Sequence, residues 1–276
     1  MREIIKKIIP PILLDMYRDL RTDKEVKQER EVLLSLQEIP RFKENLISIG
    51  GMELKYVDSA SFRFIYEELF HKEIYKFRSD SSAPLIIDAG ANIGLGIIYL
   101  KKIFPGAEII AFEPDIKVFR VLEYNINSLQ LKNVRLINKG LWNEETTLRF
   151  YSEGADGGRL ATDSDTEKIT EITTEKLSPF LKDREVDFLK MDIEGSEYIV
   201  LKESKEYLKH VKNIFVEYHS FVGKEQYLPE LLALLKEAGF RLNINVPGLI
   251  SPTPFVAISN YAGMDMQLNI YGYRPG

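Results

Sequence analysis

The pattern of hydrophobic and polar residues changes near residue 84. From there on, short apolar runs alternate with longer segments in which apolar residues recur at helical spacing. Alternation of strands and helices predicts an α/β fold with a mostly parallel sheet that is covered on both faces. The predicted strands are 85–89, 108–113, 133–138, 186–192 and 212–218, and the predicted helices are 95–104, 115–129, 174–182, 196–207 and 225–238.

An insertion separates the third and fourth predicted strands. Segments 148–151 and 169–173 resemble two extra strands, and they flank a polar loop, Ser152 to Lys168. Ligands in open α/β sheets bind outside the carboxyl ends of the strands, and this loop is expected near that edge. An antiparallel hairpin is expected to close the sheet, formed from 240–246, 255–259 and 267–272 and interrupted by a proline-rich loop, Pro247 to Pro254.

We expect residues 1–80 to form an extension in front of the main domain, and we place the main domain at 81–276. Alternating residues on both sides of Gly50-Gly51 predict a hairpin. The expected helices lie in the charged stretch 21–38 and in the aromatic-rich stretch 61–70. We expect this extension to act as a lid or as the surface of a homodimer.

Residues 1–20 carry apolar side chains at helical spacing, although Pro10 and Pro11 must break or kink any helix there. The plainer interpretation is a helix that packs on the main domain. The alternative is a helix that rests on a membrane surface or on a partner. Because no small-residue cleavage site follows, we do not expect this segment to act as a signal peptide.

Composition narrows the class of protein. A hydrophobic share of 45% is ample for a core, and the chain has no apolar stretch long enough to span a bilayer. The net charge of −5, without a face rich in lysine and arginine, gives no reason to expect a nucleic-acid partner. Cysteine is absent, which excludes disulfides and thiolate chemistry and fits a cytoplasmic protein, peripheral to the membrane if residues 1–20 contact lipid.

The stretch from Leu85 to Gly94 predicts a cofactor site, because a buried strand there runs into a glycine turn and then a helix. A dinucleotide fold needs G-x-G-x-x-G, but here Asn92 takes the place of the second close-approach glycine. Asp88, at the end of the strand, would repel a diphosphate and suit a cation. S-adenosylmethionine carries an ammonium and a sulfonium and no phosphate, so a methyl-donor site is favoured.

A second acid, Glu113, ends the next predicted strand. It follows Gly90 by one helix and one strand, and a carboxylate at that place can accept hydrogen bonds from both hydroxyls of a ribose. The alternative is an ordinary α/β turn with an exposed glutamate. The two acids together with the glycines favour the cofactor interpretation.

Polar side chains also end the fourth and fifth predicted strands. Lys190, Asp192 and Glu194 alternate at the end of the fourth, and Glu217 and His219 at the end of the fifth. Acids and a histidine that follow apolar strand residues are hard to explain as solubility features. The plainer alternative, in which Glu197 starts a helix and the others form structural hydrogen bonds, stays open.

Four strings resemble the FkbM-type S-adenosylmethionine-dependent methyltransferases. They are residues 87–94 (IDAGANIG), 111–115 (AFEPD), 189–197 (LKMDIEGSE) and 216–219 (VEYH), and the similarity covers about 84–245. The resemblance implies a Rossmann-like seven-stranded methyltransferase sheet. It also implies transfer of a methyl group to a hydroxyl of a polyketide, sugar or other secondary metabolite, so the expected partner is a small-molecule or glycan acceptor.

The resemblance also implies which residues bind the cofactor, whose product form is S-adenosylhomocysteine. The turn would border the methionine end, Glu113 the ribose, and segment 138–142 the adenine. The residues concerned are Asp88, Ala89, Gly90, Ala91, Asn92, Gly94, Glu113, Pro114, Gly140, Leu141 and Asp192. The extension and the tail after 245 lie outside the resemblance, and substrate identity is expected to be encoded there.

Methyl transfer to a hydroxyl is helped by a base, and His219 is the best candidate because its ordinary pKa is near neutrality. Asp192 and Glu194 are expected to assist it, to orient the acceptor, or to hold a divalent metal, although no spacing demands a metal. Two other classes of function stay open. One is a non-catalytic cofactor-binding protein that acts as a membrane or partner adaptor, and the other is a nicotinamide oxidoreductase.

Overall fold

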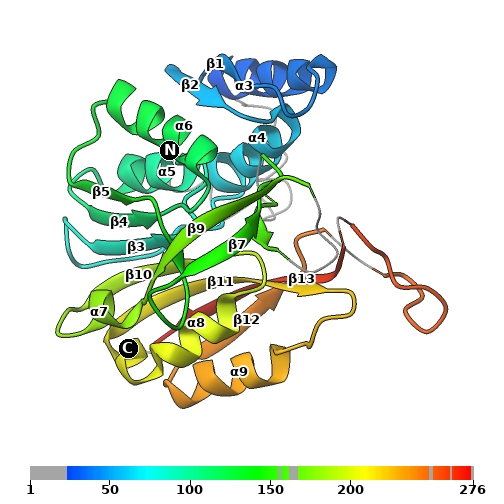
Figure 1. Ribbon diagram of the computed structural model, residues 1–276. Coiled ribbons are helices and arrows are strands. Elements are labelled where there is room, and N and C mark those ends of the chain that lie inside the picture. The colour runs from blue at the N-terminus through cyan, green and yellow to red at the C-terminus, as the bar shows by residue number, and fades with distance from the viewer. Residues whose placement is uncertain (1–23, 155–156, 162–166, 249–250, 262, 275–276) are drawn as a thin grey trace, which may run out of the picture.

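A computed structural model describes residues 24–274 apart from 155–156, 162–166, 249–250 and 262. Its centre is a seven-stranded sheet in the order β12-β13-β11-β10-β3-β4-β5 (Figure 1). Pairing is parallel from β11 through β10, β3 and β4 to β5, and β13 is antiparallel to both of its neighbours. The strands are β3 (Leu85–Ala89), β4 (Glu108–Phe112), β5 (Val134–Ile137), β10 (Val186–Met191), β11 (Val211–Phe221), β12 (Arg241–Asn245) and β13 (Met264–Tyr273). The predicted sheet is confirmed.

Successive residues of the central strands face two different cores, which explains why these strands are continuous apolar runs. Ile86 and Phe188 face one core, whereas their neighbours Ile87 and Leu189 face the other. Figure 1 shows helices on both sides of the sheet. The first core includes α5 (Leu95–Ile103) and α6 (Ile116–Ser128), and the second includes α8 (Glu197–Glu203), α9 (Leu228–Glu237), the short α7 (Ser178–Leu181) and a 3-10 helix (Lys205–His210).

The extension shares the first of these cores. Its elements are α3 (Lys24–Ser35), a 3-10 helix (Leu36–Glu38), β1 (Asn45–Ile49), β2 (Met52–Tyr56), α4 (Ser59–Tyr66) and one turn of π-helix (Glu67–His71). The hairpin expected around Gly50 and Gly51 is confirmed, because β1 and β2 pair directly across that turn. The expected helix within residues 1–20 lies outside the described residues. No helix in the described part of the chain is long and apolar enough to cross a membrane.

Asn125, which is fully buried on α6, joins the extension to the rest of the protein. Its Nδ2 donates hydrogen bonds to the carbonyl oxygens of Lys55 in β2 (2.9 Å) and Ile93 (2.8 Å). Its Oδ1 accepts a hydrogen bond from the Lys55 amide (2.7 Å). One side chain therefore anchors the extension directly to the turn that follows β3.

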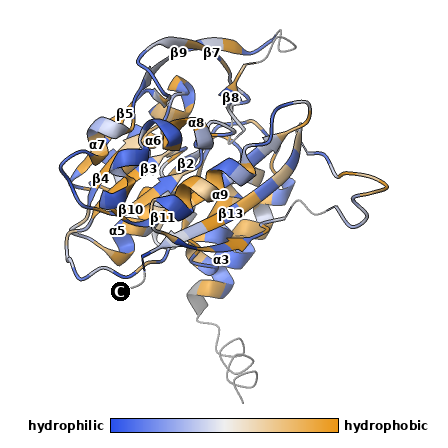
Figure 2. Ribbon diagram, turned by 90° about the horizontal axis from the view of Figure 1, so that it is seen from below, coloured by the Kyte–Doolittle hydropathy of each residue, from blue (hydrophilic) through white to orange (hydrophobic). Residues whose placement is uncertain are grey.

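The insertion forms a second, four-stranded sheet that stands apart from the main one (Figure 2). Its strands are β6 (Gly140–Leu141), β7 (Thr147–Tyr151), β8 (Arg159–Leu160) and β9 (Ile169–Glu175). The two expected strands are confirmed as β7 and β9, which pair antiparallel.

Two predicted elements were wrong. The helix expected over 174–182 shrinks to α7, because residues 174 and 175 continue β9 and Thr174 Oγ1 donates hydrogen bonds to carbonyls of the β6–β7 connection. The strand expected over 255–259 is absent, because the amides of Val256 and Ala257 donate hydrogen bonds to the Thr253 carbonyl in a turn that starts at Pro254.

Candidate active site

A cavity of about 560 Å³ opens at the carboxyl ends of the central parallel strands. Its walls include the extension, the turn after β3, the end of β4, the insertion, and the ends of β10, β11 and β13. Representative lining residues are Glu68, Gly90, Glu113, Leu141, Asp192 and His219. The volume is within the usual range for small-molecule sites.

The turn after β3 depends on glycine at two positions. Gly90 has φ of 82°, and a Cβ atom there would lie 1.8 Å from the Asp192 carbonyl oxygen. Gly94 has φ of 89° and caps α5, and its absent Cβ would meet Leu122 Cδ1 at 2.7 Å. Both positions need the left-handed backbone and the missing side chain. Gly94 and Ala89 shape the turn without lining the cavity, whereas Asp88, Ala91 and Asn92 line it.

Glu113 stands next to this turn, directly after β4. Its carboxylate accepts hydrogen bonds from the amides of Asn92 (3.0 Å) and Asp115 (2.9 Å). Burial raises the pKa of Glu113 to about 7, although these two hydrogen bonds oppose the shift. Each carboxylate oxygen keeps a second lone pair that can accept a ligand hydroxyl.

The segment expected near the adenine also reaches this part of the cavity. Asn138 Nδ2 donates hydrogen bonds to the carbonyl oxygens of Glu113 (2.8 Å) and Pro114 (3.1 Å). This fixes the chain so that Gly140 and Leu141, in β6, line the cavity together with Pro114. A Cβ atom at Gly140 would lie 3.0 Å from Ile172 Cδ1, so glycine keeps this wall thin.

Lys190 lies at the centre of the site, a role that the sequence analysis did not assign to it. Its buried ammonium donates hydrogen bonds to the carbonyl oxygens of Ala89 (3.2 Å) and Gly90, and it lies 3.5 Å from Asp88 Oδ1 and 3.2 Å from Asp192 Oδ2. Burial lowers its pKa, but the carboxylates of Asp192 and Asp88 outweigh burial and hold the pKa above its ordinary value. Lys190 thus carries a positive charge that links the ends of β3 and β10.

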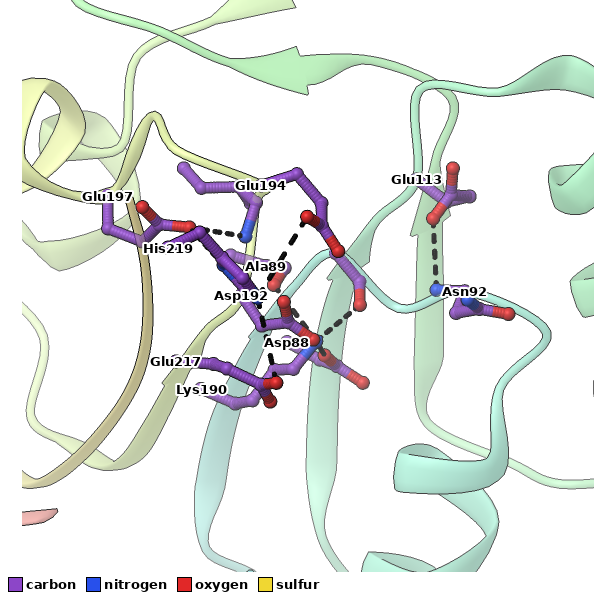
Figure 3. A network of polar contacts seen from close by, with 12 residues as sticks. Asp88, Ala89, Asn92, Glu113, Lys190, Asp192, Glu194, Glu197, Glu217 and His219 are labelled. Atoms are coloured by element: carbon purple, nitrogen blue, oxygen red, sulfur yellow. Dashed lines mark hydrogen bonds and ion pairs between the residues drawn. The ribbon is translucent and has the colours of Figure 1, made fainter. Parts of the chain in front are cut away.

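The loop after β10 is folded around Glu197. Its Oε1 accepts hydrogen bonds from the amides of Ile193 (3.3 Å) and Gly195 (2.9 Å), and it lies 3.2 Å from His219 Nδ1. Glu194 and Gly195 adopt the left-handed backbone that this tight loop needs, with φ of 56° and 95°. Glu197 therefore begins α8 and also fixes the orientation of the His219 ring (Figure 3).

His219 faces further carboxylates with its other nitrogen. Nε2 lies 3.6 Å from Glu217 Oε1 and 3.9 Å from Glu194 Oε2. Burial lowers the pKa of His219, but the carboxylates of Glu194, Glu197 and Glu217 outweigh burial and raise it well above its ordinary value. The sequence-predicted residues Asp192, Glu194 and His219 are brought together, with one ligand atom from each within 4.8 Å of the others.

The extension supplies cavity residues that the sequence analysis missed. Glu68, in the π-helical turn, is buried in the cavity wall, and its pKa is raised to about 7 by burial and then by Glu217. Arg41 and Arg63 line the same cavity from the extension. The periodicity of an ordinary α-helix does not predict that Glu68 faces the cavity. The wider π-helical turn changes which side chains point inward.

Comparison with known proteins agrees with this geometry. A family model described as the methyltransferase FkbM domain matches residues 88–242. Methyltransferase sdnD of Sordaria araneosa is 29% identical over 231 residues, covering 71% of this chain and 88% of that protein. The 31-O-demethyl-FK506 methyltransferase FkbM of Streptomyces tacrolimicus is 25% identical over 236 residues, again covering 71% and 88%. The crystal structure of methyltransferase FkbM from Methylobacillus flagellatus KT covers 88% of this chain and 59% of that chain at 16% identity, with a TM-score of 0.46.

The matched range includes the turn after β3, Glu113, the β10 loop and His219. It spans more than half of the chain. The chain therefore belongs to the FkbM family of methyltransferases, and it is an S-adenosylmethionine-dependent methyltransferase.

Proposed function

We propose that this enzyme transfers the methyl group to a hydroxyl of a small molecule, a sugar or a glycan. The observation that carries the proposal is the position of the buried group Asp192, Glu194 and His219. It lies in the same cavity as the turn after β3 and Glu113. A hydroxyl is a weak nucleophile that benefits from loss of its proton, and this group offers proton acceptors beside the cofactor residues.

The cofactor is proposed to lie across the ends of β3, β4 and β10. Glu113 would accept the ribose hydroxyls with its free lone pairs, and Gly140 and Leu141 would border the adenine. The turn from Asp88 to Gly94 would border the methionine end. Support for this placement comes from Gly90, whose missing side chain lets the backbone approach closely, and from the carboxylates that suit a sulfonium cation.

The chemistry is a single in-line displacement. A lone pair of the acceptor oxygen attacks the methyl carbon, the carbon–oxygen bond forms, and the electrons of the carbon–sulfur bond return to sulfur. This neutralises the sulfonium and yields S-adenosylhomocysteine. The acceptor proton passes to the group formed by Asp192, Glu194 and His219, in which His219 is the candidate base once its own proton has moved to one of the neighbouring carboxylates. Walls from the extension and the insertion keep water away from the reacting atoms.

Acceptor recognition is proposed to reside in the extension, which contributes charged and aromatic side chains to the cavity. Arg63, Phe64 and Glu68 line it from this part of the chain. The name of one relative, the 31-O-demethyl-FK506 methyltransferase FkbM of Streptomyces tacrolimicus, supports a small-molecule acceptor by analogy.

Incubation with methyl-labelled S-adenosylmethionine and a panel of sugars, lactone polyols and phenols tests this proposal. The expected product is a methyl ether, identified by mass spectrometry, and Glu194→Gln is expected to lose turnover while keeping S-adenosylhomocysteine affinity. Matched amine acceptors serve as controls. Methylation of amines alone would contradict O-methylation, and full cofactor binding without transfer to any acceptor would favour a non-catalytic adaptor.

A further inference from the structure

We propose that Asp192, Glu194 and His219 form a binding site for one divalent metal ion of the Mg²⁺ or Mn²⁺ class. Asp192 and Glu194 come from the loop after β10, and His219 comes from β11, which pairs directly with β10. The inference deepens the proposed function, because the ion would lie where the acceptor hydroxyl is expected to bind. It rests on the arrangement of the side chains themselves.

The geometry of the three ligand atoms fits a single ion. They lie within 4.8 Å of one another, whereas two ligands of such an ion lie about 4.2 Å apart when they are opposite and about 3.0 Å apart when they are at right angles, for a bond of roughly 2.1 Å. The three atoms would therefore move closer together on binding, and the side chains of Asp192 and Glu194 are partly exposed on their loop. Two carboxylates and one imidazole suit Mg²⁺, Mn²⁺ and similar ions, and three protein ligands leave positions for a substrate.

His219 has the arrangement of a metal ligand rather than of a structural histidine. Its side chain is only 1% exposed, and Nδ1 contacts the buried Glu197 carboxylate at 3.2 Å. Since a carboxylate only accepts, Nδ1 carries a hydrogen, and loss of the Nε2 proton on metal binding would present a lone pair to the cavity. Among the described residues, no hydrogen-bonding partner lies within 3.5 Å of Nε2. A carboxylate that holds the far nitrogen of a metal-binding histidine is the usual outer-shell arrangement.

The charges around this site also call for a cation. Within the part of the chain that the structure describes, the carboxylates of Asp88, Asp192, Glu194, Glu197 and Glu217 are joined by ion pairs to two cationic side chains, Lys190 and His219 (Figure 3). Lys190 is held on the carbonyls of Ala89 and Gly90 and contacts Oδ2 of Asp192. It therefore orients the Asp192 carboxylate from the side of β3. Buried anionic charge in excess is costly unless a cation neutralises it.

A bound ion changes how the acceptor proton is lost. The ion would hold the acceptor oxygen in one of its open positions and lower the pKa of the hydroxyl. His219 would then be a ligand, and the proton would pass to Glu217, which lines the same cavity and is not one of the three ligands. The methyl transfer itself is unchanged: the oxygen–carbon bond forms, and the carbon–sulfur electrons return to sulfur.

Titration of the chelator-treated full chain with MnCl₂, by calorimetry and by electron paramagnetic resonance of free Mn²⁺, tests the site. We expect one Mn²⁺ per chain, and about tenfold or greater loss of affinity in Glu194→Gln and in His219→Ala. Glu68→Gln is the matched control, because it removes a buried carboxyl of the same cavity that is outside the group. S-adenosylhomocysteine affinity and melting temperature report whether each variant is folded.

Absence of Mn²⁺ binding below millimolar concentrations, or equal losses in Glu68→Gln and Glu194→Gln, would overturn the site. Full methyl transfer after removal of metal by a chelator would also overturn the metal site. The proposed O-methylation would then stand, with His219 again as the candidate base. Specific Mn²⁺ binding without methylation of any hydroxyl acceptor would support the site and contradict the proposed function instead. The two proposals can therefore fail separately.

Discussion

The two halves of the cavity are built in different ways. The half at the ends of β3 and β4 is made mainly of backbone: a glycine turn, two amides that hold Glu113, and a thin wall at Gly140. The half at the ends of β10 and β11 is made of charged side chains, with Lys190 and His219 among carboxylates. Both halves join residues that lie at the ends of neighbouring strands and about 20 to 25 positions apart in the sequence.

This difference separates two tasks. A backbone-built half recognises the shape and hydroxyls of a cofactor that is the same for every member of such a family. A half built from ionisable side chains can activate a nucleophile, because its protons and charges can move. The comparison predicts that substitutions in the first half change cofactor affinity and substitutions in the second change turnover. Gly90 is the exception, because it touches both.

Gly90→Ala is expected to have the largest effect, because its Cβ would lie 1.8 Å from the Asp192 carbonyl and force the two halves apart. We expect loss of S-adenosylhomocysteine affinity by roughly 100-fold or more, measured by calorimetry, and a loss of stability of about 3 kcal/mol. Gly223→Ala is the control, since Gly223 has φ of 77° but no neighbouring atom within 4 Å. Equal behaviour of the two variants would show that backbone strain, and not the contact with Asp192, matters at Gly90.

Asn125→Ala is expected to lower the free energy of unfolding by about 3 kcal/mol, measured by denaturant titration. The variant loses three hydrogen bonds and leaves buried backbone groups of Lys55 and Ile93 without partners. Because Ile93 belongs to the cofactor turn, we also expect a several-fold loss of S-adenosylhomocysteine affinity. Asn127→Ala, on the exposed side of the same helix, should change neither quantity. An unchanged affinity would mean that the extension does not support the cofactor half.

Glu113→Gln is expected to weaken S-adenosylhomocysteine binding by about 10- to 100-fold, because hydrogen bonds to a charged acceptor contribute roughly 1.5–3 kcal/mol. The amide of glutamine can accept only through one oxygen, so one of the two backbone contacts is also lost. Glu108→Gln, at the exposed start of β4, is the control. If both variants bind as the wild type does, Glu113 does not contact the ribose.

A smaller effect is expected from pH. The pKa of Glu113 is raised to about 7 by burial, with Asp115 and Lys190 as the charged groups that act on it. Binding needs the carboxylate, so affinity should be constant above pH 7 and fall below it by up to about tenfold per pH unit. Calorimetry at several pH values should show this slope in the wild type and a flat profile in Glu113→Gln. A slope retained in the variant would assign it to another group.

The same shift affects stability. The folded protein keeps a proton on Glu113 at pH values between the ordinary pKa of 4.5 and about 7, where the unfolded chain has released it. Stability rises with pH only where the unfolded state binds more protons. This group therefore lowers the free energy of unfolding as the pH rises through that interval.

Most of the fold could be predicted from the sequence, because its central strands have neighbours of the same kind on both sides. Ile86 and Ile87 face different cores, so the strand is apolar throughout, and glycine or proline marks its ends. Prediction failed where tertiary contacts decide. Thr174 continues β9 because its hydroxyl bonds to the β6–β7 connection, and the loop around Thr253 turns where alternation suggested a strand.

The predicted residues of both halves are brought to one cavity. Asp88, Asn92, Glu113, Asp192, Glu194 and His219 lie at or near the ends of their strands, and all of them line it. Lys190 and Glu197 received no functional role, because their contacts with Gly90 and His219 depend on how neighbouring strands pair in the sheet. Glu68 was missed entirely, since no local pattern shows that a π-helical turn directs it into the cavity. The assignment of catalysis to Asp192, Glu194 and His219 stays a prediction.

The central claim is that the two halves are separable, and calorimetric titration with S-adenosylhomocysteine tests it most directly. Wild type, Glu113→Gln and Glu194→Gln are compared, with NADH as the control ligand. We predict binding of S-adenosylhomocysteine alone, about tenfold or more weaker in Glu113→Gln and within about twofold of wild type in Glu194→Gln, because the product sulfur carries no charge for Glu194 to attract. Equal losses in the two variants, or binding of NADH in place of S-adenosylhomocysteine, would contradict the account.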